Sequence, residues 1–260
     1  MAAVTQLDID IRLKSYPAVG NAPPVEALKA LRFSVPVGEF TCIVGPSGCG
    51  KTTLLNIVAG LDADFTGRVD VAATAERPLP VIGYVFQRPR LLPWRTVEEN
   101  IRLVLSPEQN RSGIVDDLLM ATGLAEARHT YPERLSVGMS RRAALARAFA
   151  IEPDLLLMDE PFVSLDESTA ERLRALLLSI WGRRPTTVLF VTHDTREAAQ
   201  LADRVIVLTP SPGSVRSIIA IETPRPHRGN GEVIDAIRQQ ILGETPGDNA
   251  KQPHALKHGG

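Results

Sequence analysis

The sequence predicts an α/β fold with a mixed, mainly parallel core sheet, and two observations carry this prediction. The first is a set of three continuous apolar runs, at residues 155–158, 188–191 and 205–208, each bounded by breakers. Such runs are typical of strands that are buried on both faces of a parallel sheet. Between the first two, residues 167–181 have the spacing of an amphipathic helix. The second observation is a glycine-rich turn between another apolar run and a helical segment, so strands alternate with helices.

The glycine-rich turn fits the pattern Gly-x4-Gly-Lys-[Ser/Thr] of a phosphate-binding loop. Glycines let backbone N–H groups curl around phosphate oxygens, and the following helix points its positive end at them. Lys51 supplies a charge to the β- and γ-phosphates, and the Thr52 hydroxyl can bind Mg²⁺. The alternative is a chance glycine turn, which the flanking strand at residues 40–44 and helix at 54–60 make rare. We therefore predict nucleotide binding by Gly45, Pro46, Ser47, Gly48, Cys49, Gly50, Lys51, Thr52 and Thr53.

The other segments surround this core in a definite order. Residues 7–13 alternate apolar and polar, which predicts a half-exposed strand, and residues 25–37 predict another strand pair. An antiparallel β element therefore precedes the phosphate loop. Short strands are expected at the end of 62–71 and at 81–86, followed by a helical subdomain inserted between two strands of the sheet. In the tail, residues 232–242 predict one amphipathic helix, and the remainder, rich in Gly, Pro, His and Lys, predicts disorder.

Composition places the chain among ordinary globular proteins. It has 260 residues, of which 44% are hydrophobic and 23% charged, and its net charge of -1 gives no basic footprint for nucleic acid. No apolar run approaches the roughly 18 residues that span a bilayer, and the N-terminus shows no signal peptide. Cys42 and Cys49 lie around the loop in an arrangement that disfavours a disulfide, so a reducing, cytoplasmic setting is expected.

Polar residues follow several predicted strands, at the edge of the sheet where the phosphate loop begins. Asp159 can hold Mg²⁺ directly or through water, and Glu160 can polarise an attacking water as a general base. His193 can bond a γ-phosphate, and Gln87 can sense both Mg²⁺ and water without repelling either. For each of them, the simpler alternative is a polar residue that merely ends a strand. Tyr16 is a candidate stacking platform for adenine, with turn packing as its alternative.

Taken in order, these features resemble the ATP-binding subunit of an ABC transporter, over residues 5 to about 224. The resemblance implies a P-loop NTPase of the ABC type, which binds and hydrolyses ATP with Mg²⁺. The matching pieces are the A-loop aromatic Tyr16, the Walker A loop 45–53, the Q-loop glutamine Gln87, the signature 135–139, the Walker B strand ending in Asp159 and Glu160, the D-loop 164–166 and the switch histidine His193.

The resemblance also implies a role for each matched residue. Catalysis would rest on Glu160, His193 and Lys51, and the metal ligands would be Thr52, Gln87 and Asp159. In the family, two subunits sandwich two ATP molecules, and the signature of one subunit caps the γ-phosphate held by the other. The residues that would contact nucleotide outside the Walker A loop are Tyr16, Gln87, Ser136, Gly138 and Asp166.

The signature departs from the usual Leu-Ser-Gly-Gly-Gln, because residues 135–139 read Leu-Ser-Val-Gly-Met. Ser136 and Gly138 are kept. Val137 is expected to restrict φ and to narrow the approach of the nucleotide, and Met139 lacks the amide that could reach the ribose. We expect hydrolysis to survive because the Walker residues are intact; a weakened second composite site is the alternative.

Residues 83–101 and 161–167, together with Met139, are similar to the nitrate/sulfonate/taurine import branch of the family. That similarity implies a homodimer working with two integral-membrane permease subunits and, indirectly, an extracytoplasmic solute-binding protein. The expected location is the cytoplasmic face of the inner or plasma membrane, and the expected cargo is nitrate, sulfonate, taurine or a similar small anion. The ATPase domain would cover residues 5–224, with the helical subdomain at about 95–152, and 225–260 would be a short, partly disordered extension.

Two rival functions fit the sequence less well. A soluble ABC-type ATPase that acts as a mechanical or regulatory switch usually has two ATPase halves or a long coiled-coil insertion, and this chain shows neither. An ordinary P-loop kinase or GTPase would not need the signature, the D-loop and the switch histidine.

Overall fold

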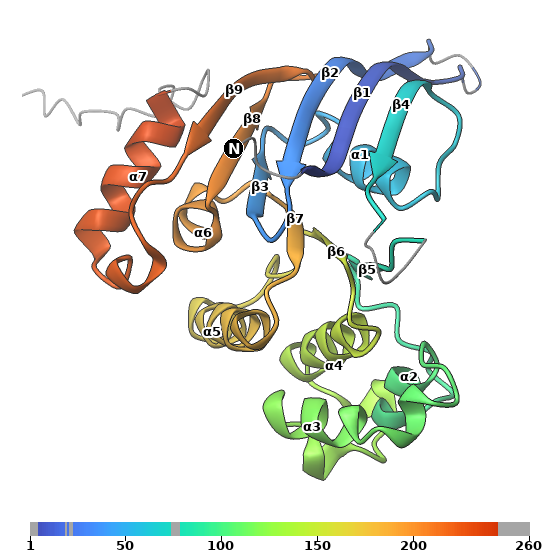
Figure 1. Ribbon diagram of the computed structural model, residues 1–260. Helices are drawn as coiled ribbons and strands as arrows, with labels where there is room; N and C mark the ends of the chain where they lie inside the picture. Colours follow the sequence, from blue (N-terminus) through green and yellow to red (C-terminus); the bar gives the residue numbers. More distant parts are fainter. Residues whose placement is uncertain (1–4, 19, 21–22, 74–78, 244–260) are drawn as a thin grey trace, which may run out of the picture.

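The computed structural model describes residues 5–18, 20, 23–73 and 79–243, and it contains two sheets with helices between and around them (Figure 1). The first five strands of the larger sheet are parallel and the last is antiparallel to its neighbour, which confirms the mixed, mainly parallel core. In spatial order the strands are β5 (Ile82–Val85), β6 (Leu155–Asp159), β7 (Thr187–Thr192), β3 (Phe40–Val44), β8 (Arg204–Leu208) and β9 (Val215–Ala220).

The central strands are buried on both faces because their alternate side chains belong to two different cores. In β3, Cys42 packs with the helices on one side of the sheet, whereas Ile43 packs toward the antiparallel sheet on the other. Phe190 and Leu189 divide in the same way in β7. Successive side chains of a strand point to opposite faces of the sheet. Because both faces are covered by apolar side chains here, no position of the strand faces water, which explains its uninterrupted apolar sequence.

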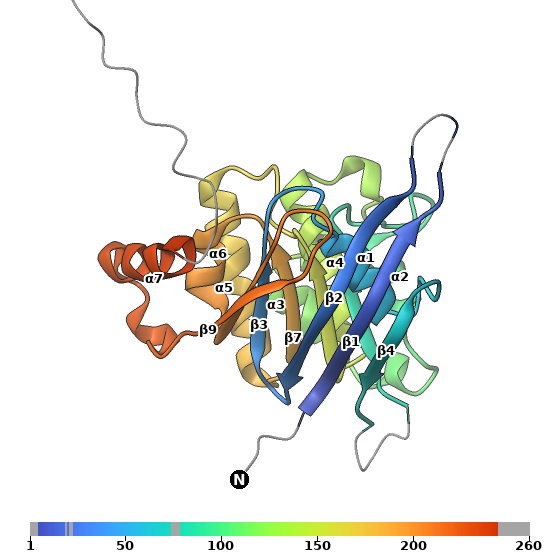
Figure 2. The same ribbon diagram turned by 90° about the horizontal axis from the view of Figure 1, so that it is seen from above.

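The smaller sheet has the order β2 (Val25–Pro36), β1 (Thr5–Tyr16), β4 (Thr66–Val71), all antiparallel, and it covers helix α1 (Lys51–Val58) (Figures 1 and 2). The prediction of a strand pair within residues 25–37 is wrong. That segment is one twelve-residue strand, because it pairs with β1 along its whole length.

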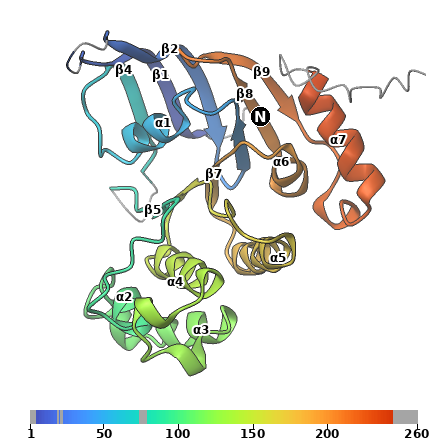
Figure 3. The same cartoon turned by 180° about the vertical axis from the view of Figure 1, so that it is seen from behind.

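Helices α5 (Glu167–Arg183), α6 (Thr195–Leu201) and α7 (Gly231–Gly243) cover the opposite face of the large sheet (Figure 3). The predicted tail helix is therefore present. Its residues Ile234, Ile237 and Ile241 are buried, and the preceding Arg228 donates hydrogen bonds to carbonyls at the end of α6. The prediction of disorder is wrong for residues 222–231, where a short 3-10 helix (Arg225–His227) and the buried Arg228 order the chain. After the helix, the prediction falls on residues 244–260, which lie outside the described residues.

The helical subdomain lies between β5 and β6 in the chain and projects from that edge of the sheet (Figure 1). It contains α2 (Val97–Arg102), α3 (Ile114–Ala121) and α4 (Val137–Ala150). Glu98 ties its parts together, because its carboxylate bonds both Arg102 and Arg128. Within the described ranges, none of the helices combines the length and the apolar character that crossing a bilayer requires.

Candidate active site

The phosphate loop connects β3 to α1, as the sequence predicts, and its glycines are dictated by backbone geometry and close packing. Gly48 and Gly50 have φ of 79° and 96°, a region that favours glycine. A Cβ on Gly50 would also lie 2.7 Å from the carbonyl oxygen of Ala27 in the neighbouring sheet. Gly213 also packs against the loop, so closely that a Cβ on it would lie 2.1 Å from the Cys49 carbonyl oxygen. The loop is therefore held in one shape by two other segments of the chain.

Lys51 closes this loop from inside. Its Nζ donates hydrogen bonds to the carbonyl oxygens of Gly45, at 2.8 Å, and Pro46, at 3.0 Å. The side chain is 6% exposed, so the ammonium lies within the curl of the loop, where phosphate oxygens would meet it.

Thr52 and Asp159 converge beside the loop. The Thr52 hydroxyl donates to Asp159 Oδ1 at 3.2 Å, and Asp159 ends the buried strand β6. Burial raises the pKa of Asp159, and the hydrogen bond from Thr52 acts in the opposite direction. Among the described residues there is no group of three His, Cys, Asp or Glu side chains that could hold a metal unaided. One carboxylate and one hydroxyl fit Mg²⁺ instead, since this ion takes most of its ligands from water and substrate phosphates.

Glu160 lies between the two other polar strand ends. Its Oε1 is 3.2 Å from His193 Nδ1, and Gln87 Nε2 donates to its Oε2 at 3.4 Å. Glu160 has φ of 43°, and its N–H is held by the Val191 carbonyl oxygen at 3.0 Å. This turned backbone follows directly on the buried strand, so the carboxylate is aimed by the sheet rather than by a loose loop. Three residues from separate parts of the sequence thus meet at one edge of the sheet.

A cavity of about 390 Å³ joins this cluster to the end of β1. Tyr16 forms one wall, and its hydroxyl is 3.0 Å from Thr53 Oγ1 at the start of α1. Tyr16 as a residue is 41% exposed, and it lines the cavity. The predicted residues that line the cavity are Tyr16, Ser47, Gly48, Gly50, Lys51, Thr52, Thr53, Gln87 and Glu160.

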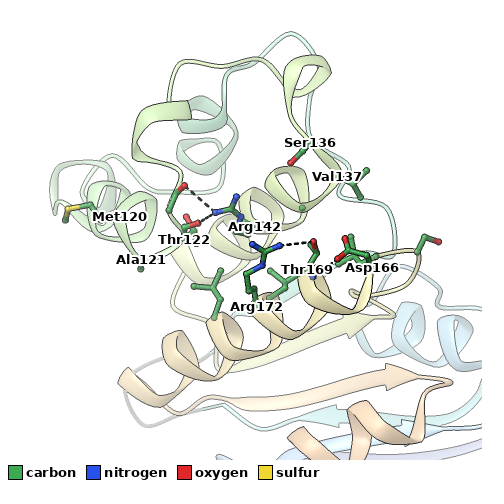
Figure 4. Close-up of a pocket in the computed structure, with 15 residues that line it drawn as sticks. Met120, Ala121, Thr122, Ser136, Val137, Arg142, Asp166, Thr169 and Arg172 are labelled. Carbon is green, nitrogen blue, oxygen red and sulfur yellow. Dashed lines mark hydrogen bonds between the residues drawn. The ribbon is translucent and has the colours of Figure 1, made fainter.

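Three other predicted residues, Ser136, Gly138 and Asp166, line a different cavity, of about 680 Å³, between the helical subdomain and α5 (Figure 4). Ser136 caps α4 and accepts a hydrogen bond from the Met139 N–H at 3.2 Å. Asp166 caps α5, and its bonds from Ser168 and Thr169 lower the pKa of its carboxyl to about 2. Ser136, Gly138 and Asp166 thus gather in one place, and none of them lines the cavity of Tyr16 and Lys51.

The two adjacent signature positions differ in a way that the sequence did not reveal. Val137 is the first residue of α4 and is 60% exposed; its φ is not positive, so its branched side chain carries no backbone strain. The expected restriction of φ therefore has no cost here, because a β-branched residue adopts this helical backbone, and the expected narrowing of the nucleotide's approach stays a prediction. Gly138 is the constrained position, because a Cβ there would lie 3.1 Å from Thr169 Cγ2 on α5.

Two arginines of α4, the buried Arg141 and the partly buried Arg147, connect the helical subdomain to the Q-loop, and the sequence interpretation missed both. Arg141 donates to the carbonyl oxygens of Gln87 and Val163, and Arg147 donates to those of Pro89 and Arg90. Burial lowers the pKa of both guanidinium groups. In the sequence, these residues stand out only as arginines within an alanine-rich helical segment.

Comparison with known proteins agrees with this fold and this geometry. The ABC transporter family matches residues 28–163. The aliphatic sulfonates import ATP-binding protein SsuB 2 of Burkholderia lata is 46% identical over 206 residues, covering 79% of this chain and 76% of that protein. The SsuB protein of Bacillus licheniformis is 42% identical over 240 residues, covering 92% and 94%. The chain therefore belongs to the ABC transporter family, and the predicted import branch is confirmed.

A solved structure supports the same class. The ATP-binding cassette MJ0796, in a dimeric post-hydrolysis state bound to ADP and Pi, superposes with a TM-score of 0.70 at 30% identity, covering 84% of this chain and all of that one. The dimeric structure of the same cassette has a TM-score of 0.69. Within its family the chain is thus the ATP-binding subunit, an ATPase.

Proposed function

We propose that this ATPase energises a membrane importer of aliphatic sulfonates or a similar small anion. The observation that carries the proposal is the meeting of Glu160, Gln87 and His193 beside Lys51 and Thr52, in a chain whose relatives are sulfonate import proteins.

In the proposed reaction, ATP lies in the 390 Å³ cavity with its adenine on Tyr16 and its phosphates in the loop around Lys51. Glu160 accepts a proton from a water molecule, whose oxygen attacks the γ-phosphorus. The bond from the γ-phosphorus to its bridging oxygen breaks, and ADP and phosphate leave. His193 contacts Glu160 through Nδ1, so its other ring nitrogen, Nε2, is available to bond a γ-phosphate oxygen.

Mg²⁺ is part of this proposal, with Thr52, Asp159 and Gln87 as the side chains that would hold it. The convergence of the Thr52 hydroxyl on Asp159 supports this assignment. When bound, the ion would neutralise charge on the β- and γ-phosphates.

We also propose that two copies close head-to-tail. Ser136, Gly138 and Asp166 of one copy would then face the nucleotide held by the other, which accounts for their position in a separate cavity. The helix start at Ser136 offers backbone N–H groups to a γ-phosphate. The dimeric MJ0796 structures are the precedent for such a pair.

The proposed setting is the cytoplasmic face of a membrane, where the dimer would bind two permease subunits. For import, an extracytoplasmic solute-binding protein would deliver the cargo. The test is to purify the tagged protein from gently solubilised membranes of its host, with whatever integral membrane proteins accompany it, and to reconstitute the complex in proteoliposomes.

We expect ATP-dependent uptake of an alkanesulfonate, with taurine, nitrate and sulfate as competitors that rank the specificity. Uptake of one of the competitors in preference to alkanesulfonates would show that the proposed cargo is wrong, while the proposed role in an importer would stand. A protein recovered on ribosomes or DNA, without membrane partners, would favour the rival switch function.

A further inference from the structure

Lys14 is a buried lysine that the proposed reaction does not use, and it lies directly behind the proposed adenine platform. Its side chain is 3% exposed, and its Nζ bonds Asp62 Oδ1 at 2.9 Å. The same Nζ bonds the Asp64 carbonyl oxygen at 2.7 Å and approaches the Asp64 carboxylate at 3.4 Å. Both acids belong to the turn between α1 and β4. Lys14 therefore ties β1 to the turn at the far end of the phosphate-loop helix.

The ammonium also contacts an aromatic ring. Lys14 Nζ is 4.7 Å from the centroid of the Tyr16 ring, within the range of about 6 Å for a cation–π interaction. The Tyr16 hydroxyl lies 3.0 Å from Thr53 Oγ1 and also bonds the side chain of Asp62. One contact sets the face of the ring and the other sets its edge, so the orientation of the ring is determined from two directions.

Lys14 remains a cation in this position. Burial alone would lower its pKa, but the hydrogen bonds and charges of Asp62 and Asp64 outweigh burial, and the pKa is raised. The group cannot reach a nucleotide itself, because it is enclosed and all of its bonds go to the turn and the ring. Any effect that it has on a bound base must pass through Tyr16.

We propose that Lys14 is a positioning residue for nucleobase recognition: it holds the Tyr16 ring and draws electron density from the face that it covers. An electron-poor phenol stacks better on an electron-rich purine, so the preference for ATP over pyrimidine nucleotides depends on Lys14. This inference rests on the proposed function, in which ATP occupies the cavity beside Tyr16.

The test compares ligands with and without a base on the full chain. Kd is measured for ATP, CTP and inorganic tripolyphosphate with Lys14→Met, and with Lys29→Met as the matched control. Lys29 is an exposed lysine on the neighbouring strand β2, paired with Glu26. We expect Lys14→Met to raise the Kd for ATP about three- to thirty-fold, the span of such a contact, and to bring the Kd values for ATP and CTP closer together. Tripolyphosphate should bind unchanged, and Lys29→Met should have no effect.

A merely structural role for Lys14 would weaken ATP and tripolyphosphate equally, and that result would overturn the inference. Tyr16→Ala separates the inference from the function beneath it. If Tyr16→Ala leaves ATP binding unchanged, the adenine platform itself is wrong. If Tyr16→Ala weakens ATP and Lys14→Met adds no further loss in that background, Lys14 acts through the ring. A second loss of full size in the double variant would contradict this.

Asp64→Asn provides a second measurement if Lys14→Met fails to fold, since the Asp64 carboxylate lies 3.4 Å from the Lys14 ammonium. This substitution weakens the hold on the Lys14 ammonium without creating a cavity. We therefore expect a smaller loss of ATP affinity, again with no loss of tripolyphosphate affinity. Equal losses for ATP and tripolyphosphate would again reject the proposal.

Discussion

The two ends of the proposed reaction site are built in different ways. Asp159 and Glu160 lie at the end of the buried parallel strand β6, so a sheet that is packed on both faces positions them, and Thr52 in the first turn of α1 bonds Asp159. Ser136 instead caps α4, a helix of the projecting subdomain that packs on one face of the sheet and donates hydrogen bonds from Arg141 and Arg147 to backbone carbonyls of the Q-loop and of Val163. A sheet packed on both faces resists movement, whereas a subdomain that projects from one edge of it can shift as a unit. In the proposed reaction, the chemistry would therefore lie on the fixed part, and the capping groups would come from a part that can move.

The largest effect is expected on the fixed side of this comparison. Glu160→Gln should lower kcat by about 10²–10⁴-fold, because it removes the group that accepts the proton of the attacking water. ATP affinity should stay near that of the parent, since the loop and Tyr16 are untouched. Steady-state hydrolysis and equilibrium binding measure both quantities. Glu171→Gln, at an exposed position of α5, is the control, and a Glu160→Gln protein with parental kcat would sink the assignment.

The next effect separates two neighbours on the movable side. Gly138→Val should lower kcat by about ten-fold or more, because overpacking against Thr169 costs about 1–3 kcal/mol and displaces the start of α4. Val137→Gly should change kcat by no more than about two-fold, since Val137 is exposed and unstrained. Parallel ATPase assays decide the matter. The reverse order of sensitivity would show that the nucleotide approaches Val137 and not the packed glycine.

A smaller effect is expected from loosening the attachment. Arg141→Met removes two hydrogen bonds from a charged donor, worth about 1.5–3 kcal/mol each, and should lower kcat about ten-fold while leaving the Kd for ATP unchanged. Arg111→Met, at an exposed arginine of the same subdomain, is the comparison. An Arg141→Met variant that loses ATP affinity and keeps kcat would place the arginine in the fixed half.

The smallest effect on catalysis, and a clear one on stability, should come from Glu98. Its bonds with Arg128 and Arg102 lower the pKa of its carboxyl from 4.5 to about 2. Because the folded pKa is depressed, the stabilisation, at most about 3 kcal/mol, is fully present above pH 4.5 and is lost as pH falls toward 2. Urea unfolding of Glu98→Gln and the parent should differ most at pH 7. Their difference should shrink by about half at pH 3. A difference independent of pH would mean that packing, not charge, is responsible.

The fixed half was largely predictable from the sequence, and the movable half was not. Residues such as Asp159 and His193 follow apolar runs directly, so a local pattern places them at a sheet edge. Arg141 and Arg147 contact residues that are 54 and 58 positions away in the sequence, so no periodic pattern of residues predicts these contacts. Gly213 was missed for the same reason, since its importance arises only because the connection between β8 and β9 packs against the loop. The single long strand β2 was misjudged because its pairing partner, and not its own composition, sets its length.

The separation of the two cavities has a consequence for genetics. In a head-to-tail pair, each site combines the phosphate loop of one copy with the signature of the other. An allele defective at Lys51 and an allele defective at Ser136 would each be inactive alone, because both sites of each homodimer carry the lesion. In a mixed pair both lesions fall in the same site, and the other site is whole. Two null alleles of one gene would then restore transport to each other in the same cell.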